Sequence, residues 1–138
     1  MRIDLSSVMV DDQEKALQFY TGKLGFVKMA DIPMGDYRFL TVTSPEGPQG
    51  IELVLEPIIF PQAKDFQKTL FESGSPIIAF RTDDIDTEYK KLKAKGVVFK
   101  GEPQIIGPIK SVLFEDTCGN LINLVQPLVK PSVQRSSL

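Results

Sequence analysis

The chain has 138 residues, a net charge of −2 and a pI near 5.2, so it lacks the positive surface that nucleic-acid binding requires. Its apolar runs are far shorter than the roughly 20 residues that cross a bilayer, and its first residues do not form a secretion signal, so we expect a cytoplasmic protein without a membrane partner. It contains no histidine, which excludes Ser-His-Asp and Cys-His nucleophiles and metal sites built on histidine.

The first half of the chain has the pattern of a strand, a helix and three further strands. Residues 3–10 form a largely apolar run that predicts a strand. Asp11 with Glu14 has the spacing of a helix N-terminal cap, and Gly25 suits the C-terminal cap of the same helix. The apolar residues between them fall on one helical face: Ala16, Leu17, Tyr20 and Leu24. Strands are expected at residues 26–29, 38–43 and 51–56.

The second half repeats this order. Ile85, Tyr89 and Leu92 share one face of a predicted helix, which Gly96 ends. Strands are expected at residues 77–81, 97–99, 110–114 and 121–125. The two halves align at an offset of about 71 residues, which indicates an internal duplication of one βαβββ unit.

The repeat defines the expected organisation of one domain. The two units should occupy residues 1–56 and 77–127. Residues 57–76 predict a linker with a short helix, because Pro61 suits its first turn and Phe66 and Leu70 share a face. Residues 128–138 have no periodicity and predict a frayed tail.

Three local patterns resemble the vicinal-oxygen-chelate superfamily, which includes glyoxalases, bleomycin-resistance proteins and extradiol dioxygenases. The first is Val10-x-Asp12 followed by Ala16-Leu-x-Phe-Tyr20 and Leu24-Gly-Phe26. The second runs from Asp83 to Val97, and the third is Phe114-Glu-Asp-x-x-Gly-Asn-Leu-Ile122. The resemblance covers residues 2–127 and implies an α+β fold, in which tandem βαβββ units form a cupped mixed sheet around a cleft.

Enzymes of that superfamily hold a divalent metal with four side chains inside the cupped sheet. The resemblance assigns these four positions to Leu5, Glu52, Ile77 and Asn123. Since Leu and Ile have no lone pair to offer a metal, we expect neither a metal nor another cofactor. The glutathione-binding arginine of lactoylglutathione lyases corresponds to Met9, so the glyoxalase reaction is not expected. Extradiol dioxygenase activity is not expected without histidine.

The remaining resemblance is to metal-free binding members such as bleomycin-resistance proteins. We predict a protein that binds a small molecule in a mainly apolar cleft, with Glu52 and Asn123 as its polar groups. Two alternatives stay open: a metal-independent lyase or isomerase with Glu52 as general base, and a structural or regulatory dimer with a closed cleft. A homodimer is expected, because one four-stranded unit is too small to bury both faces of its sheet.

The candidate residues also have simpler explanations. A strand carboxylate such as Glu52 can lie on a solvated face, and Asn123 can be held by a hydrogen bond inside the protein. Leu5 and Ile77 fit the lining of a core or cavity. Arg38 follows a turn-like segment and is a candidate for ligand contact at the cleft mouth. Cys118, the single cysteine, has no flanking Lys or Arg and predicts an inert thiol.

Overall fold

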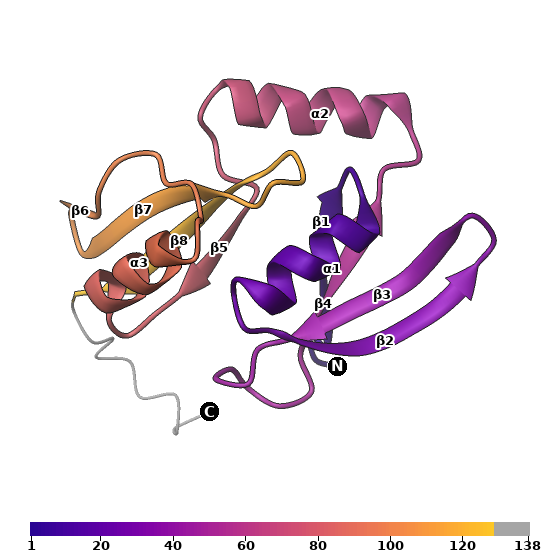
Figure 1. Ribbon diagram of the computed structural model, residues 1–138, viewed down its shortest axis with the longest axis horizontal. Coiled ribbons are helices and arrows are strands. Elements are labelled where there is room, and N and C mark those ends of the chain that lie inside the picture. Colours follow the sequence, from indigo (N-terminus) through magenta and orange to yellow (C-terminus); the bar gives the residue numbers. More distant parts are fainter. Residues whose placement is uncertain (129–138) are drawn as a thin grey trace.

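The computed structural model describes residues 1–128, and these form two four-stranded mixed sheets and three helices (Figure 1). The predicted fold class, α+β with a tandem repeat, is confirmed by this architecture. The predicted frayed tail begins at residue 128 and, from residue 129 onward, lies outside the described residues. None of the described helices is long and apolar enough to cross a membrane.

The N-terminal sheet has the strand order β1-β4-β3-β2, and β1 runs parallel to β4. Its elements are β1 (Leu5–Val10), α1 (Gln13–Gly22), β2 (Val27–Met34), β3 (Tyr37–Thr43) and β4 (Glu52–Pro57). The N-terminal cap of α1 is Asp12 rather than the expected Asp11, because the Asp12 carboxylate accepts the Lys15 N–H at 3.0 Å. The helix packs its apolar face on this sheet.

The C-terminal sheet repeats the same plan in the order β5-β8-β7-β6, with β5 parallel to β8. Its elements are β5 (Ile78–Arg81), α3 (Ile85–Ala94), β6 (Gln104–Ile106), β7 (Ile109–Glu115) and β8 (Leu121–Pro127). In each half, the last strand (β4 or β8) therefore runs parallel to the first strand (β1 or β5), as expected if one unit was duplicated.

One expected strand is wrong. Residues 97–99 form only an isolated bridge, between Phe99 and Phe114, and the outer strand of the sheet is β6 instead. Val97 is 5% exposed and Phe99 packs against the core, so their apolar pattern reflects a buried loop. Gly101 follows with a φ of +98°, a left-handed conformation that interrupts extended backbone.

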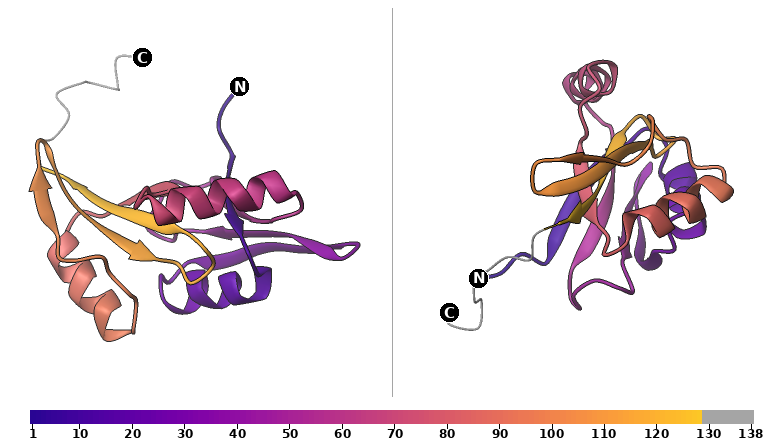
Figure 2. Two further views of the ribbon diagram at one scale, coloured as in Figure 1. Left: turned by 90° about the horizontal axis from the view of Figure 1, so that it is seen from above. Right: turned by 90° about the vertical axis from the view of Figure 1, so that its left-hand side faces the viewer.

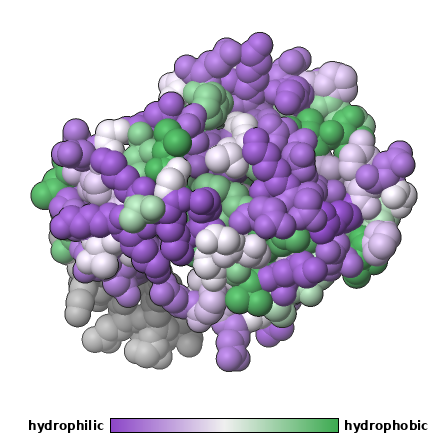
Figure 3. All heavy atoms as spheres, viewed as in Figure 1, coloured by the Kyte–Doolittle hydropathy of each residue, from purple (hydrophilic) through white to green (hydrophobic). Residues whose placement is uncertain are grey.

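A single core connects the two halves. Phe19 and Tyr20 of α1 contact aromatic rings of the C-terminal sheet, with ring centroids 6.4 Å apart for both Phe19–Phe114 and Tyr20–Phe80. Helices α1 and α3 lie on the same side of the two sheets (Figure 2). That side of the molecule is largely hydrophilic, with smaller hydrophobic areas between the charged side chains (Figure 3).

Helix α2 (Pro61–Glu72) connects the halves and lies apart from α1 and α3 (Figure 1). Its buried residue is Gln67, and Ala63, Leu70 and Phe71 on the same side are half-buried, whereas Phe66 is 55% exposed and lies off this side. The Gln67 amide nitrogen lies 3.1 Å from each of three acceptors: Met9 O, Cys118 O and Asn120 Oδ1. A polar anchor within a partly buried apolar side therefore docks this helix.

Candidate functional site

One face of the N-terminal sheet packs on α1, and the other does not. Val8, Val10, Leu40, Val42 and Leu55 point to the helix side and are at most 2% exposed. Because side chains alternate along a strand, the residues between them point the opposite way. The register places Leu5 beside Glu52, and Val54 between Ser7 and Thr41. We call this second side the open face; it comprises Leu5, Ser7, Met9, Tyr37, Phe39, Thr41, Thr43, Glu52 and Val54, with Val27, Ile32 and Met34 of β2.

Apolar side chains of the open face remain accessible to solvent. Their exposed fractions lie between 41% and 61% for Leu5, Val27, Ile32, Met34 and Tyr37. Contiguous exposed apolar surface on a small protein marks a place where a ligand or another protein binds. The open face is therefore the candidate binding surface of this half.

Glu52 and Thr41 form a polar pair within this apolar surface. The Thr41 hydroxyl donates to Glu52 Oε1 at 2.5 Å, and it accepts the Ala30 backbone N–H at 3.0 Å. Since Ala30 supplies one proton to the hydroxyl oxygen, the hydroxyl's own proton is directed at the carboxylate. Thr41 is fully buried and Glu52 is half-buried, and within residues 1–128 no cation forms an ion pair with Glu52. Among residues 1–128, no side chain or backbone group donates a hydrogen bond to the second carboxylate oxygen of Glu52.

The four positions that the resemblance assigns to a metal supply few donor atoms. Leu5 and Glu52 are direct neighbours in the first sheet, whereas Ile77 and Asn123 belong to the second sheet. One carboxylate and one amide are the only donors in this set, and no cluster of three or more His, Cys, Asp or Glu suited to a metal occurs among residues 1–128. These residues do not fit a divalent metal.

The corresponding face of the C-terminal sheet carries Asn123. It lies opposite Ala79 on β5 and Leu113 on β7, and it is half-buried. Its side chain forms no hydrogen bond with any other residue of the described part of the chain. The internal partner considered from the sequence is thus not present there, and the amide is available to solvent or ligand. Ile77 packs against the core, and its N–H donates to Leu121 O at 3.0 Å.

Met9 and Arg38 lie in different surroundings. Met9 is half-buried on the open face, where its carbonyl accepts hydrogen bonds from Asn120 and Gln67. Arg38 pairs with Pro33 in the β2–β3 ladder and shares the helix side with Leu40, away from Glu52. Its guanidinium makes a two-pronged contact with Asp31, at 2.9 and 2.8 Å, which holds the pKa of Asp31 at about 2. The structure thus does not bring Arg38 together with the other candidates.

A buried polar cluster joins the two halves beside the open face. The Asp116 carboxylate is fully buried and accepts hydrogen bonds from Tyr20 Oη, Cys118 N, Asn120 N and Asn120 Nδ2, at 2.7 to 3.1 Å. Burial raises the pKa of Asp116, although these donors oppose that effect. Burial and the Asp116 charge also raise the pKa of Tyr20 well above its usual value. This cluster fixes the β7–β8 turn against α1 and β1.

Comparisons with known proteins agree with this geometry. A model of the Glyoxalase/Bleomycin resistance protein/Dioxygenase superfamily matches residues 2–124. The chain belongs to this superfamily. A relative in Bacillus subtilis (strain 168), the protein YurT, is 49% identical over 126 residues, which are 91% of this chain and 99% of YurT.

Two solved structures are similar to this chain over most of its length. UcmS2 superposes with a TM-score of 0.76 at 27% identity, over 91% of this chain and 97% of UcmS2. TnmS3 from Streptomyces sp. CB03234, an antibiotic binding protein, superposes with a TM-score of 0.71 at 33% identity, over 92% of this chain and 96% of TnmS3. The resemblance inferred from the sequence is thereby confirmed.

Two functional features escaped the sequence reasoning. Thr41 was not a candidate, although the alternation of residues 38–43 puts it on one face and a hairpin through residues 44–50 brings it near Glu52. Asp116 was noted only as part of a turn. Its role depends on Tyr20, 96 positions away in the sequence, which no local pattern indicates.

Proposed function

We propose that this protein binds a small, mainly apolar molecule against the open face, with Glu52 as the hydrogen-bond acceptor and without a bound metal. The observation that carries the proposal is the Thr41–Glu52 pair, a preoriented carboxylate set among exposed apolar side chains. Ligand pockets have this composition, an apolar wall with a few fixed polar groups. The similarity to TnmS3, an antibiotic binding protein, supports sequestration of a ligand as the role.

The open face favours a ligand that donates a hydrogen bond. Thr41 occupies Oε1 of Glu52, so a ligand N–H or O–H can be accepted by Oε2. A hydrogen bond to a charged acceptor contributes roughly 1.5 to 3 kcal/mol. Burying the apolar body of the ligand against Leu5 and Val27, which lie in the same cross-strand row as Glu52 and are about half exposed, supplies the rest, at about 25 cal/mol per Å². The carboxylate therefore sets orientation, and the apolar surface supplies most of the affinity.

We also propose a homodimer in which a second copy closes the open face into a cleft that holds the ligand between the two chains. A strand surface with this much exposed apolar area is rarely left uncovered in a stable protein. Light scattering at micromolar concentration should give twice the chain mass of 15.4 kDa. A species of one chain mass at that concentration would contradict the dimer, while leaving binding to the open face as a separate question.

A titration with an unbiased library of metabolites and antibiotics tests the binding function. The wild type should bind at least one apolar compound, and Glu52→Gln should bind it about tenfold more weakly. Glu72→Gln on α2, where the side chain is 65% exposed, is the matched control and should not change the affinity. Turnover of a bound compound would favour the lyase or isomerase alternative with Glu52 as base. Absence of any ligand would favour the structural dimer.

A further inference from the structure

A second cavity lies between the two halves, on the side of the sheets that carries the helices. Its volume is about 420 Å³, within the range of small-molecule pockets. Apolar side chains from both halves line its interior: Leu24, Phe26, Phe80, Leu92, Phe114 and Leu124. Phe80, Phe114 and Leu124 belong to the helix-covered face of the C-terminal sheet, so this cavity lies on the helix side of the molecule. A smaller adjoining pocket, which shares Phe26 and Phe80 with it, extends to Glu52 at the edge of the open face. We call it the inter-half cavity.

The aromatic floor of the inter-half cavity is well ordered by its own contacts. The rings of Phe26 and Phe80 meet edge to face, with centroids 5.4 Å apart, and Tyr20 packs behind them. Both phenylalanines stay half-buried, so part of each ring faces the cavity. Such a floor accepts a planar or aliphatic group without rearrangement of the core.

The rim carries charges of both signs. Arg81 and Lys91 contribute positive charge, and Glu46 and Glu88 contribute negative charge. Arg81 contacts only the exposed Asp83, at 3.6 Å, and none of the other three forms an ion pair within residues 1–128. A ligand with a single charge would be repelled by the pair of rim residues that carry the same charge. A zwitterion can place its carboxylate near the positive pair and its ammonium group near the negative pair.

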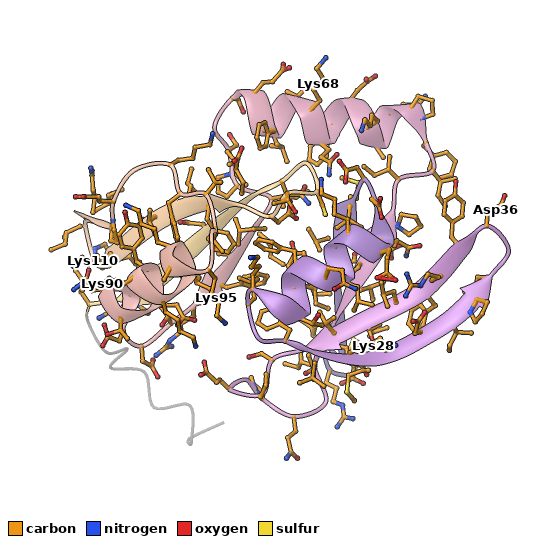
Figure 4. The ribbon with its side chains drawn as sticks, in the orientation of Figure 1. Lys28, Asp36, Lys68, Lys90, Lys95 and Lys110 are labelled. Carbon is orange, nitrogen blue, oxygen red and sulfur yellow. The ribbon has the colours of Figure 1, made fainter. Side chains whose placement is uncertain are left out.

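Contacts at one end connect the helices that flank the cavity. Lys23 Nζ donates to Lys95 O, and Lys95 Nζ lies 3.5 Å from Lys23 O, so the end of α1 is tied to the end of α3. Lys95 and Lys90 are labelled on α3 in Figure 4, where Lys95 lies on the side toward α1. These ties help keep the two walls of the cavity at a fixed separation.

We propose that the inter-half cavity is a second ligand site that takes an amphipathic zwitterion with an apolar body, the chemistry of an aromatic α-amino acid. The apolar body lies on Phe26 and Phe80. The carboxylate faces Arg81 and Lys91, and the ammonium group faces Glu88 and Glu46.

Three probes with the same phenyl body test this assignment. L-phenylalanine carries both charges, 3-phenylpropionate lacks the ammonium group, and phenethylamine lacks the carboxylate. Because the chain contains no tryptophan, binding is followed by the backbone amide shifts of the uniformly ¹⁵N-labelled full chain. Phenylalanine should shift the amides of Phe26, Phe80 and Leu92, and each singly charged probe should bind about tenfold more weakly.

Variants of the rim separate charge recognition from simple apolar binding. Lys91→Met should weaken phenylalanine about tenfold and should not weaken phenethylamine, which loses only a like charge at the rim. Glu88→Gln should weaken phenylalanine and phenethylamine about tenfold and should not weaken 3-phenylpropionate. Lys68→Met on α2, with a side chain 69% exposed, is the matched control and should leave all three affinities unchanged. Leu5→Ser on the open face, where the side chain is 50% exposed and lines neither pocket, should also leave phenylalanine binding unchanged, which separates this site from the proposed function. Equal affinity of the three probes, shifts confined to the open face, or no shift at 10 mM probe would each overturn the proposal.

Discussion

Replacing Asp116 by Asn perturbs the polar cluster that joins the two halves. The carboxylate is fully buried and accepts four hydrogen bonds, two on each oxygen. An amide has one acceptor oxygen, so its NH2 group faces two of these donors. Each buried group that loses its partner costs about 1 to 3 kcal/mol. Since the Tyr20 hydroxyl can rotate to accept instead of donate, we expect a loss of about 2 to 4 kcal/mol in the free energy of unfolding.

The effect of Asp116→Asn should depend on pH. Burial raises the pKa of Asp116 in the folded state, so the folded protein holds this proton more tightly than the unfolded chain does. The stability associated with Asp116 is therefore fully present below the unfolded pKa of about 3.9, and part of it is lost as pH rises through the folded pKa. The destabilisation caused by Asp116→Asn should accordingly be larger at pH 3.5 than at pH 7.

Urea denaturation of both proteins between pH 3.5 and pH 8 measures this difference. Asp83→Asn is the matched control, because that side chain is 94% exposed and the same substitution there should change stability by less than about 0.5 kcal/mol. A variant as stable as the wild type at every pH would refute the structural role of the cluster. A destabilisation that grows with pH would refute the raised pKa of Asp116.

Three further predictions follow from individual contacts. Gly119→Ala should destabilise the fold by more than about 1 kcal/mol, because Gly119 has a φ of +94° and an added Cβ would lie 2.7 Å from the Gln67 side chain. Adding Gln67→Ala to this variant should remove the steric clash but not the backbone strain. A Gly119→Ala protein of wild-type stability would contradict this prediction. Cys118 should not react with iodoacetamide in the native protein at pH 8, because burial raises the pKa of its thiol to about 12. The thiol should react once urea has unfolded the protein, and rapid labelling of the native protein would contradict this prediction. Elemental analysis of protein purified without chelators should find no equimolar Fe, Zn, Ni or Mn, given Leu5 and Ile77 at two assigned ligand positions; an equimolar metal that survives dialysis contradicts this.

Local patterns and the repeat were enough to predict most of the fold. Apolar spacing at Ala16, Leu17 and Tyr20 marks residues that are indeed buried, because helical periodicity depends only on which side faces the core. The same reasoning was wrong at residues 97–99, since a buried loop needs apolar residues as much as a strand does. In α2, the predicted start at Pro61 and a half-buried Leu70 agree with the structure, but Phe66 is exposed and the fully buried residue is the amide Gln67, which an apolar periodicity does not indicate.

The candidate site was harder to predict than the fold. The alternation of β4 put Glu52 on the face opposite Leu53 and Leu55, and the structure agrees. Its partner Thr41 depends on the register between β3 and β4, which the sequence does not specify. Arg38 was expected to contact ligand at the cleft mouth; the β2–β3 register turns it to the helix side, where it pairs with Asp31 and lines a separate pocket of about 270 Å³. Registers between strands, rather than strand positions, were the missing information.

Binding of one ligand to the wild type and to Glu52→Gln tests the central claim most directly. The tightest compound from the library is titrated calorimetrically into both proteins, and its position is mapped by backbone amide shifts. The account predicts shifts at Leu5, Thr41 and Glu52, and an affinity about tenfold lower for Glu52→Gln when the compound donates a hydrogen bond. Equal affinities for the two proteins, with shifts that avoid the N-terminal sheet, would show that the open face is not the binding site.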